Sequence, residues 1–172
     1  MKNIKIKGLS EKEIKIVSDL EFKRKYYFSR GDIKNHFKNK KEMTNTIYNL
    51  IKKGRFVRFN KDKYFLVPIK ARLNKWTDEP FIIIDETMNG KDYFIGGWGA
   101  ANYWRLTEQI PFRYDVYTVR RQGKYTLLGV EVIFHRTTLK SLNENVCEQE
   151  ITGHKFKVLR KEATKIWMKL RN

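Results

Sequence analysis

The pattern of side chains changes between Pro68 and Pro80, and this change constrains the fold more than any other feature of the sequence. Before it, apolar residues recur at helical spacing in a lysine-rich background. After it, aromatic and β-branched residues form short runs typical of strands. A chain of 172 residues is long enough for two small domains. We therefore expect an α+β protein with one domain at residues 1–70 and a second at residues 76–172.

Positive charge is concentrated in the first of these regions. The chain has 37 Lys and Arg against 19 Asp and Glu, which gives a formal charge of +18. Residues 1–70 hold 20 of the cations and 7 of the acids, whereas residues 71–138 hold 9 and 8. A genome-wide preference for lysine would spread the excess evenly. The clustering therefore indicates a surface for a polyanion such as nucleic acid.

Two helix-start signals stand in the first half of the basic region. Ser10 and Glu13 match a capping box, in which each side chain bonds the backbone of the other residue. The apolar residues that follow, three apart, are Ile14, Val17 and Leu20. A second signal, Ser29 to Asp32, predicts a helix of about two turns.

A third helix and a hairpin follow. Lys41 to Lys53 is predicted to be helical, with Gly54 after its end. Its apolar side consists of Met43, Ile47, Leu50 and Ile51. Two β-prone runs flank the turn at Asn60 to Asp62 and predict a hairpin. This order is typical of a winged helix-turn-helix, in which the third helix enters the major groove and the hairpin contacts the DNA backbone.

The candidate DNA-binding residues lie on this helix and hairpin. The helix positions opposite or beside the apolar stripe are Lys41, Thr44, Asn45, Tyr48, Asn49 and Lys52. The hairpin cations are Arg55, Arg58, Lys61 and Lys63. Asparagine, threonine and lysine can address base edges or phosphates. Arg58 and Lys61, near the turn, are the better candidates for phosphate contacts.

The second region is predicted to be a mixed α+β domain with a helix at its C-terminal end. The four expected strands are Phe81 to Ile84, Tyr93 to Ile95, Tyr114 to Arg120 and Tyr125 to Phe134. Gly99 to Leu106 lacks β-branched residues and is predicted to be a short helix. The near-neutral charge of this region favours a packed platform for self-association or for a protein partner.

No catalytic or metal-binding pattern stands out. Gly96 to Ala101 lacks a complete phosphate-binding motif, so close packing of a helix against a strand is the better interpretation. The acidic residues form no paired-carboxylate motif, and His36, His135 and His154 lack the spacing of metal ligands. We predict that the protein is not an enzyme and uses neither a metal nor a cofactor.

The single cysteine, Cys147, cannot form an internal disulfide, which is typical of a reducing compartment. The apolar runs are far shorter than the roughly 20 residues that a membrane span requires. The alternating Lys and Ile of residues 2–7 lack the apolar core of a signal peptide. A cytoplasmic protein without membrane contact is therefore expected.

Two stretches resemble a known family. One runs from Tyr93 to Pro111 and joins a tyrosine-led strand, a helix of small residues and the sequence LTEQIP. The other is the hairpin, which starts at Lys53-Gly54-Arg55 and ends at Tyr64 to Pro68. Both are similar to the AbiEi antitoxins of type IV toxin-antitoxin systems, and the resemblance covers residues 10–140.

The resemblance implies a winged-helix DNA-binding domain, an α+β second domain, and repression of the antitoxin's own operon beside a nucleotidyltransferase-like toxin. It assigns the DNA contacts to residues 41–53 and 55–63. Many members continue past the equivalent of Gly153 to Thr164 into a longer helical tail, whereas this sequence stops at Asn172.

Three functions remain open at this point. The leading one is sequence-specific binding of duplex DNA by a repressor, either an antitoxin or a stand-alone regulator. The second is a protein-interaction module that neutralises a toxin, with only non-specific nucleic-acid binding by the basic domain. The third is RNA binding by Tyr26, Tyr27 and Phe28, although core packing explains these aromatic residues better. A homo-oligomer is compatible with the first two functions.

Overall fold

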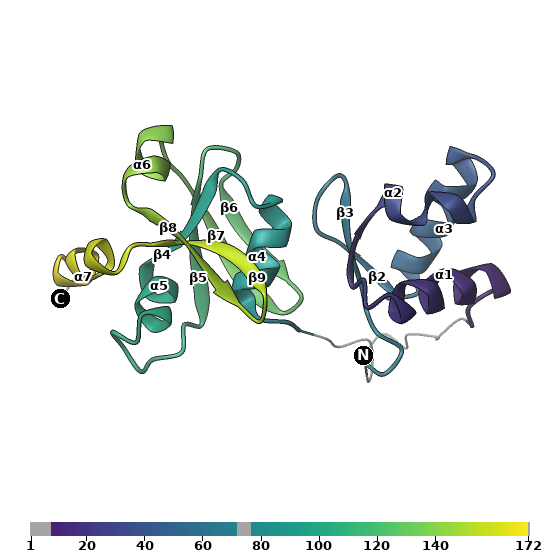
Figure 1. Cartoon of the computed structure of the whole chain (residues 1–172), viewed down its shortest axis with the longest axis horizontal. Coiled ribbons are helices and arrows are strands. Elements are labelled where there is room, and N and C mark those ends of the chain that lie inside the picture. Colours follow the sequence, from purple (N-terminus) through teal and green to yellow (C-terminus); the bar gives the residue numbers. More distant parts are fainter. Residues whose placement is uncertain (1–7, 72–76, 172) are drawn as a thin grey trace. The chain divides into compact units, whose positions relative to one another are not determined.

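The structure is a computed structural model of the chain, and it describes residues 8–71 and 77–171 (Figure 1). The chain divides into two compact units, Met1–Trp76 and Thr77–Asn172. Both units combine helices with a β-sheet, so the predicted α+β class is confirmed. No helix in the described ranges has the length and apolar character needed to cross a membrane.

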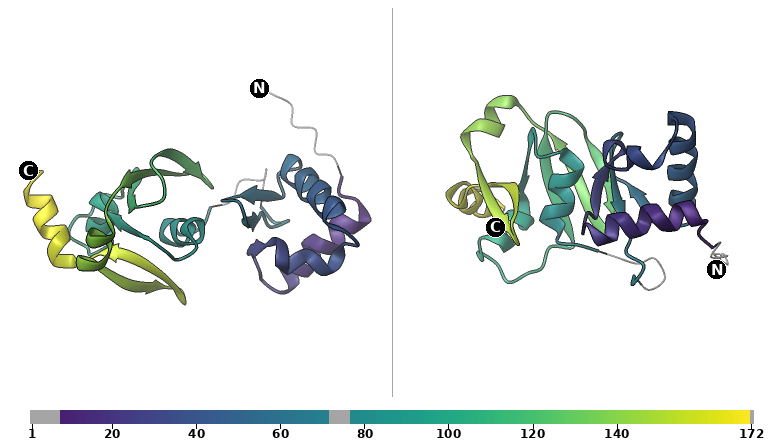
Figure 2. Two further views of the ribbon diagram at one scale, coloured as in Figure 1. Left: turned by 90° about the horizontal axis from the view of Figure 1, so that it is seen from above. Right: turned by 45° about the vertical axis from the view of Figure 1, so that its right-hand side comes forward.

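The first unit packs its helices against a three-stranded sheet. Its elements are α1 (Glu11–Phe22), β1 (Tyr27–Ser29), α2 (Arg30–Ile33), the 3₁₀ helix η1 (Lys34–His36), α3 (Lys40–Lys52), β2 (Phe56–Arg58) and β3 (Lys63–Leu66). Strand β3 lies between β1 and β2 and pairs antiparallel with both. Figure 2 shows α3 crossing α1 at a steep angle. The predicted third helix and hairpin are confirmed, whereas β1 was not predicted.

Two details of the first unit differ from the sequence prediction. The second helix is shorter than two turns, because α2 ends at Ile33 and continues as the 3₁₀ turn η1. In α1, Ile14 is 49% exposed, and the buried stripe is formed by Ile16, Val17 and Leu20. A spacing of three residues falls short of the helical period of 3.6, so a stripe read at that spacing drifts off the buried face.

The core of the first unit is rich in aromatic rings. The Phe28 ring in β1 lies 4.6 Å from that of Phe56 and 5.7 Å from that of Tyr64, measured between centroids. Tyr27 packs on Phe65 at 4.9 Å. The expectation that this aromatic run serves core packing is therefore confirmed for Phe28, which is fully buried.

The second unit is built on a six-stranded mixed sheet. Its elements are α4 (Pro80–Met88), β4 (Tyr93–Gly96), α5 (Gly97–Tyr103), β5 (Arg113–Thr118), β6 (Gly123–Leu127), β7 (Val130–Arg136), α6 (Leu139–Glu144), β8 (Val146–Ile151), β9 (His154–Leu159) and α7 (Lys161–Lys169). The strand order is β6-β7-β5-β4-β9-β8. The β4–β9 and β5–β7 pairs are parallel and the others are antiparallel.

The predicted strand at Phe81 to Ile84 is wrong, because these residues form part of α4. Pro80 occupies the first turn of the helix, where its missing N–H costs nothing. All four apolar residues are buried, and the Phe81 ring contacts Tyr114 of β5 and Phe156 of β9. A short helix covered on every side has no polar face, so its apolar run resembles a buried strand.

The predicted single strand at Tyr125 to Phe134 is also wrong, since it is the hairpin β6–β7. Its two turn residues, Leu128 and Gly129, have φ values of 47° and 81°. The β8–β9 hairpin, which was not predicted, turns in the same way at Thr152 and Gly153, with φ values of 50° and 82°. Positive φ at both central residues matches the twist of the flanking strands.

Glycines allow α5 to lie directly against β5. A Cβ atom on Gly96 would be 2.7 Å from the Tyr117 ring, and one on Gly99 would be 2.9 Å from the Tyr114 ring. Neither position has room for a side chain. The structure thus confirms the interpretation of this glycine-rich segment as close helix–strand packing.

Candidate nucleic-acid interface

Helix α3 presents a polar face opposite its buried stripe. Met43, Ile47 and Leu50 point into the core of the first unit. The predicted contact residues of this helix are all exposed: Lys41, Thr44, Asn45, Tyr48, Asn49 and Lys52. The Lys52 ammonium lies 4.8 Å from the centre of the Tyr48 ring, which is 57% exposed. The structure therefore brings these six side chains to one solvent-facing surface.

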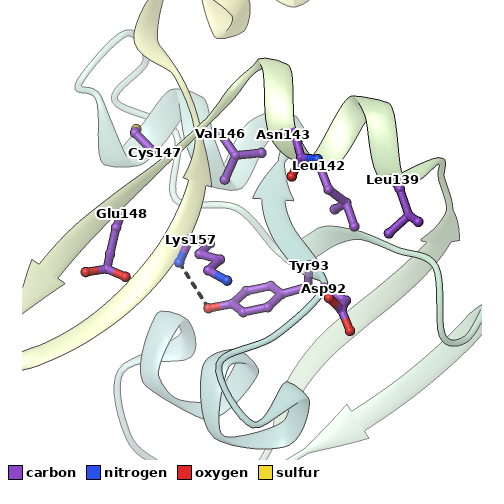
Figure 3. Close-up of a pocket in the computed structure, with 9 residues that line it drawn as sticks. All are labelled: Asp92, Tyr93, Leu139, Leu142, Asn143, Val146, Cys147, Glu148 and Lys157. Atoms are coloured by element: carbon purple, nitrogen blue, oxygen red, sulfur yellow. Dashed lines mark hydrogen bonds between the residues drawn. The ribbon is translucent and has the colours of Figure 1, made fainter.

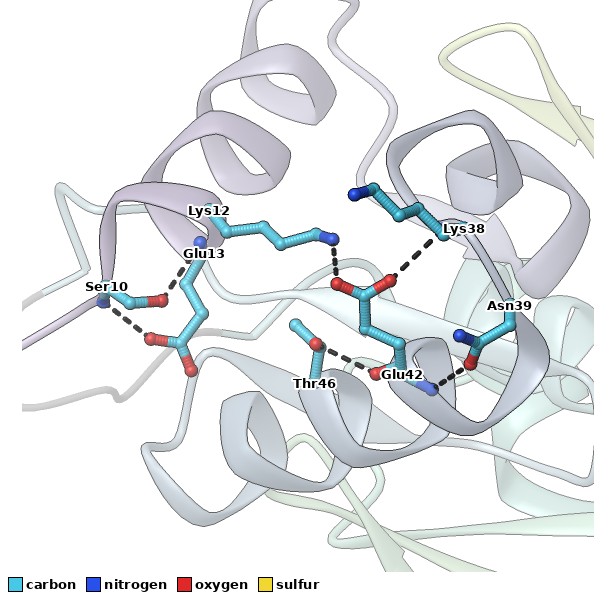
Figure 4. Close-up of polar contacts among 7 residues, drawn as sticks. All are labelled: Ser10, Lys12, Glu13, Lys38, Asn39, Glu42 and Thr46. Atoms are coloured by element: carbon cyan, nitrogen blue, oxygen red, sulfur yellow. Dashed lines mark hydrogen bonds and ion pairs between the residues drawn. The ribbon is translucent and has the colours of Figure 1, made fainter.

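The start of α3 is fixed to α1 by polar contacts (Figure 4). Asn39 caps the helix by accepting the Glu42 N–H at 2.9 Å. The Glu42 carboxylate accepts bonds from the Lys12 ammonium and from the Lys38 N–H. The Lys12 bond, followed by the Lys38 bond, holds the pKa of Glu42 below its ordinary value. The carboxylate is thus ionised and paired with Lys12.

The end of α3 is fixed to α1 by a buried ion pair. The Lys53 ammonium donates to the Glu13 carboxylate at 2.5 Å, and Glu13 is only 3% exposed. Glu13 also accepts the Ser10 N–H at 2.7 Å, which completes the predicted capping box. Burial alone would raise the pKa of Glu13. The bonds from Lys53 and Ser10 outweigh burial, so the pKa lies below its ordinary value. Both ends of α3 are therefore bonded to α1.

The β2–β3 hairpin divides its four predicted cations between two places. Arg58 and Lys61 are exposed near the tip, where Arg58 donates to the Asn60 carbonyl at 2.9 Å. Arg55 sits at the base, half-buried, and donates to the Pro68 carbonyl at 3.3 Å. Lys63 is also half-buried, on β3. Only the two tip residues are fully open to a ligand.

The turn of the hairpin is shaped by one asparagine. The Asn60 side-chain oxygen accepts the N–H groups of Asp62 and Lys63, both at 2.9 Å. Such a side-chain turn fixes the tip without help from the rest of the unit. Lys61, between these residues, is therefore displayed at a defined position.

A cavity of about 270 Å³ lies between α2, η1 and the start of α3. Its lining residues are Arg30, Gly31, Lys34, Phe37, Lys38, Asn39, Lys40 and Met43. Four of them are cations, and none is acidic. None of these lining residues was predicted as a contact residue from the sequence. The recurrence of lysine at positions 34, 38 and 40 was the available signal.

The second unit contains two pairs of histidine and aspartate. His135 bonds Asp115 at 2.7 Å, and His154 bonds Asp85 at 2.9 Å. Within the described ranges, no three His, Cys, Asp or Glu side chains gather closely enough to hold a metal ion. Burial raises the pKa of the Cys147 thiol, which disfavours the reactive thiolate.

A cavity of about 310 Å³ in this unit lies between α6, β8 and β4 (Figure 3). Its polar centre is Tyr93, whose hydroxyl donates to Asp85 at 2.6 Å and accepts the Lys157 N–H at 3.0 Å. Burial, together with the nearby Asp85 carboxylate, raises the pKa of Tyr93. The hydroxyl therefore stays protonated and serves to join β4, β9 and α4.

No family model and no curated protein matches the sequence. The crystal structure of the RV2827C protein from Mycobacterium tuberculosis is similar in fold, with a TM-score of 0.57 at 13% sequence identity. The match covers 80% of this chain and 49% of that one, so the chain spans about half the length of this structural neighbour. At this identity the likeness concerns the fold alone.

Proposed function

We propose that the protein binds duplex DNA sequence-specifically as a transcriptional regulator, with its first unit acting as a winged helix-turn-helix. In this proposal α3 enters the major groove and the β2–β3 hairpin is the wing. The observation that carries it is the surface of α3, where six predicted contact residues are exposed together on a helix held at both ends. Reading bases requires such a fixed helix, because hydrogen bonds to base edges are directional.

The resemblance to the AbiEi antitoxins extends this proposal to repression of the chain's own operon beside a nucleotidyltransferase-like toxin. The alternative is a module whose main task is to bind that toxin. Two exposed side chains on the second unit favour a protein contact there, since Ile110 is 86% exposed and Phe112 is 82% exposed.

The test is a titration of the full chain against a duplex from its own upstream region and against a scrambled duplex of equal length and composition. Both titrations use the same salt concentration. A sequence-specific regulator should prefer its own region by about 1,000-fold or more. Equal affinities for the two duplexes would instead favour non-specific binding and the toxin-binding alternative.

A further inference from the structure

Four cationic residues line the cavity between α2, η1 and α3. No carboxylate of the described residues forms an ion pair with Lys34, Lys38 or Lys40. Arg30 also lines the cavity, and its Nε donates to the Tyr64 hydroxyl at 3.2 Å. Most of the lining surface is apolar, and the charge of the four cationic residues attracts an anion to it.

The volume and the lining of the cavity indicate which class of anion fits it. Its volume of about 270 Å³ is just below the range of about 300 to 1,000 Å³ that is usual for pockets holding whole small molecules. The side chains of Phe37 and Met43 add an apolar wall. A group that combines a negative charge with carbon-bound hydrogens therefore fits better than a fully hydrated inorganic ion.

We propose that this cavity seats one phosphodiester of the DNA backbone, with the phosphate among the four cations and the adjoining deoxyribose against Phe37 and Met43. This assignment rests on the proposed DNA binding. It does not depend on the free N–H groups of α3, because Asn39 already caps the Glu42 N–H. A phosphate fixed at the start of α3 would set the register in which Thr44 and Asn45 meet the bases.

The test compares three variants of the full chain on one duplex. Lys34→Ala removes a charge from the lining, and Gly31→Leu adds a bulky side chain to a lining residue without changing the charge. A Cβ on Gly31 meets only the Ser29 hydroxyl, at an ordinary 3.5 Å, so the second variant has room on the backbone. The matched control is Lys15→Ala, which removes an exposed charge from α1. Thermal unfolding of each variant verifies that it is folded.

Lys34→Ala and Gly31→Leu should each weaken binding about tenfold, as expected for loss of a charged hydrogen bond, and Lys15→Ala should not. Lys34→Ala should also reduce the salt slope by about 1. A series of duplexes, each with one neutral methylphosphonate, locates the phosphate. At one position in the duplex, the methylphosphonate should weaken binding by the wild type. The same substitution should not weaken binding by the Lys34→Ala variant any further.

A second measurement separates the DNA backbone from a free anion. Thymidylyl-thymidine and inorganic phosphate are titrated in parallel while the amide signals of Gly31 and Asn39 are followed by NMR. The dinucleotide should shift both signals at concentrations at which phosphate does not. Equal shifts by phosphate would overturn the assignment to the DNA backbone.

The cavity assignment and the proposed DNA binding can fail separately in these experiments. If the wild type binds duplex DNA but both cavity variants behave like Lys15→Ala, only the cavity assignment is wrong. If the wild type binds no duplex at any salt concentration, the proposed function fails and the cavity assignment fails with it.

Discussion

The two units differ in their excess of positive charge. Residues 1–76 carry 22 Lys and Arg against 7 Asp and Glu, whereas residues 77–172 carry 15 against 12. Both units contain ion pairs, such as Arg120 with Asp92 in the second unit and Lys53 with Glu13 in the first. In the first unit, the exposed residues of α3 and the cavity beside it present lysines without partner acids. This difference supports the proposal that the first unit contributes most of the contacts to DNA.

Separating the units should give the largest effect. At low salt, a fragment of residues 1–76 should bind duplex DNA about 1,000-fold more tightly than residues 77–172, because the unpaired charge stays with the first fragment. With roughly 4 to 6 phosphate contacts, the logarithm of its affinity should fall against the logarithm of salt concentration with a slope of about −4 to −5. Circular dichroism verifies folding. A slope near zero, or equal binding by the two fragments, would refute the comparison.

Breaking the buried pair in the first unit should destabilise that unit alone. Lys53→Met leaves the Glu13 carboxylate buried without its ammonium, which costs about 3 to 5 kcal/mol of the free energy of unfolding. The exposed neighbour Lys52→Met is the matched control. Three of the four tryptophans, Trp98, Trp104 and Trp167, report on the second unit by fluorescence, while amide exchange in α1 and α3 reports on the first.

Adding Glu13→Gln to Lys53→Met removes the orphaned charge and should recover most of the loss. If Lys53→Met also lowers the stability of the second unit, as measured by tryptophan fluorescence, the two cores do not unfold independently. A small effect of Lys53→Met on the first unit would show that the pair does not hold α3.

The fold of the first unit was more predictable than that of the second. Its helices have one exposed side, so the apolar residues of α3 recur with a period that the sequence displays. In the second unit, α4 buries Phe81 to Ile84 together and shows no period. The turns at Leu128-Gly129 and Thr152-Gly153 lack the asparagine or aspartate that usually marks a two-residue hairpin loop.

The exposed face of α3 was predictable, because it follows from the helical period. Features of the candidate site that depend on tertiary contacts were not predictable. The period of α3 placed Asn45 and Asn49 on the exposed face. No pattern in the sequence indicates that Arg55 bonds the Pro68 carbonyl instead of facing solvent, since those residues are 13 apart. The cavity was missed for the same reason, because Arg30 reaches it from an element that precedes α3.

Base reading by α3 should produce the next largest effect. Asn45 and Asn49 lie one turn apart on the exposed face. An asparagine amide can bond the N6 and N7 atoms of adenine together, which is worth about 1 to 3 kcal/mol of discrimination. Asn45→Ala or Asn49→Ala should reduce the affinity ratio between the upstream duplex and a scrambled one accordingly. The control is Asn143→Ala, an exposed asparagine in α6 of the second unit. If both α3 variants keep the wild-type ratio while folded, these residues do not read bases.

Acid should lower the free energy of unfolding of the first unit, because Asp32 at the start of α2 becomes protonated. Burial raises the pKa of Asp32, but bonds from Lys25 and Ser29 outweigh it and lower the pKa from 3.8 to about 2. A lowered pKa contributes stability above pH 3.8 that is lost as the pH falls towards 2. The expected loss is about 1 to 2 kcal/mol, discounted because Lys25 is exposed. Asp32→Asn should flatten this part of the pH profile in urea titrations, and an unchanged profile would exclude Asp32 as its source.

The smallest effect is expected at the tip of the β2–β3 hairpin, and it tests whether charge acts by position or only by number. Arg58→Ala and Lys61→Ala should each weaken binding about fivefold, equally for upstream and scrambled duplexes, because phosphate contacts carry no base information. Lys124→Ala removes the same charge from the exposed strand β6 of the second unit. If charge alone matters, Lys124→Ala will weaken binding as much as the tip variants. If the hairpin contacts the backbone as a wing, Lys124→Ala will leave affinity unchanged. A change in sequence preference for either tip variant would instead make the hairpin a reading element.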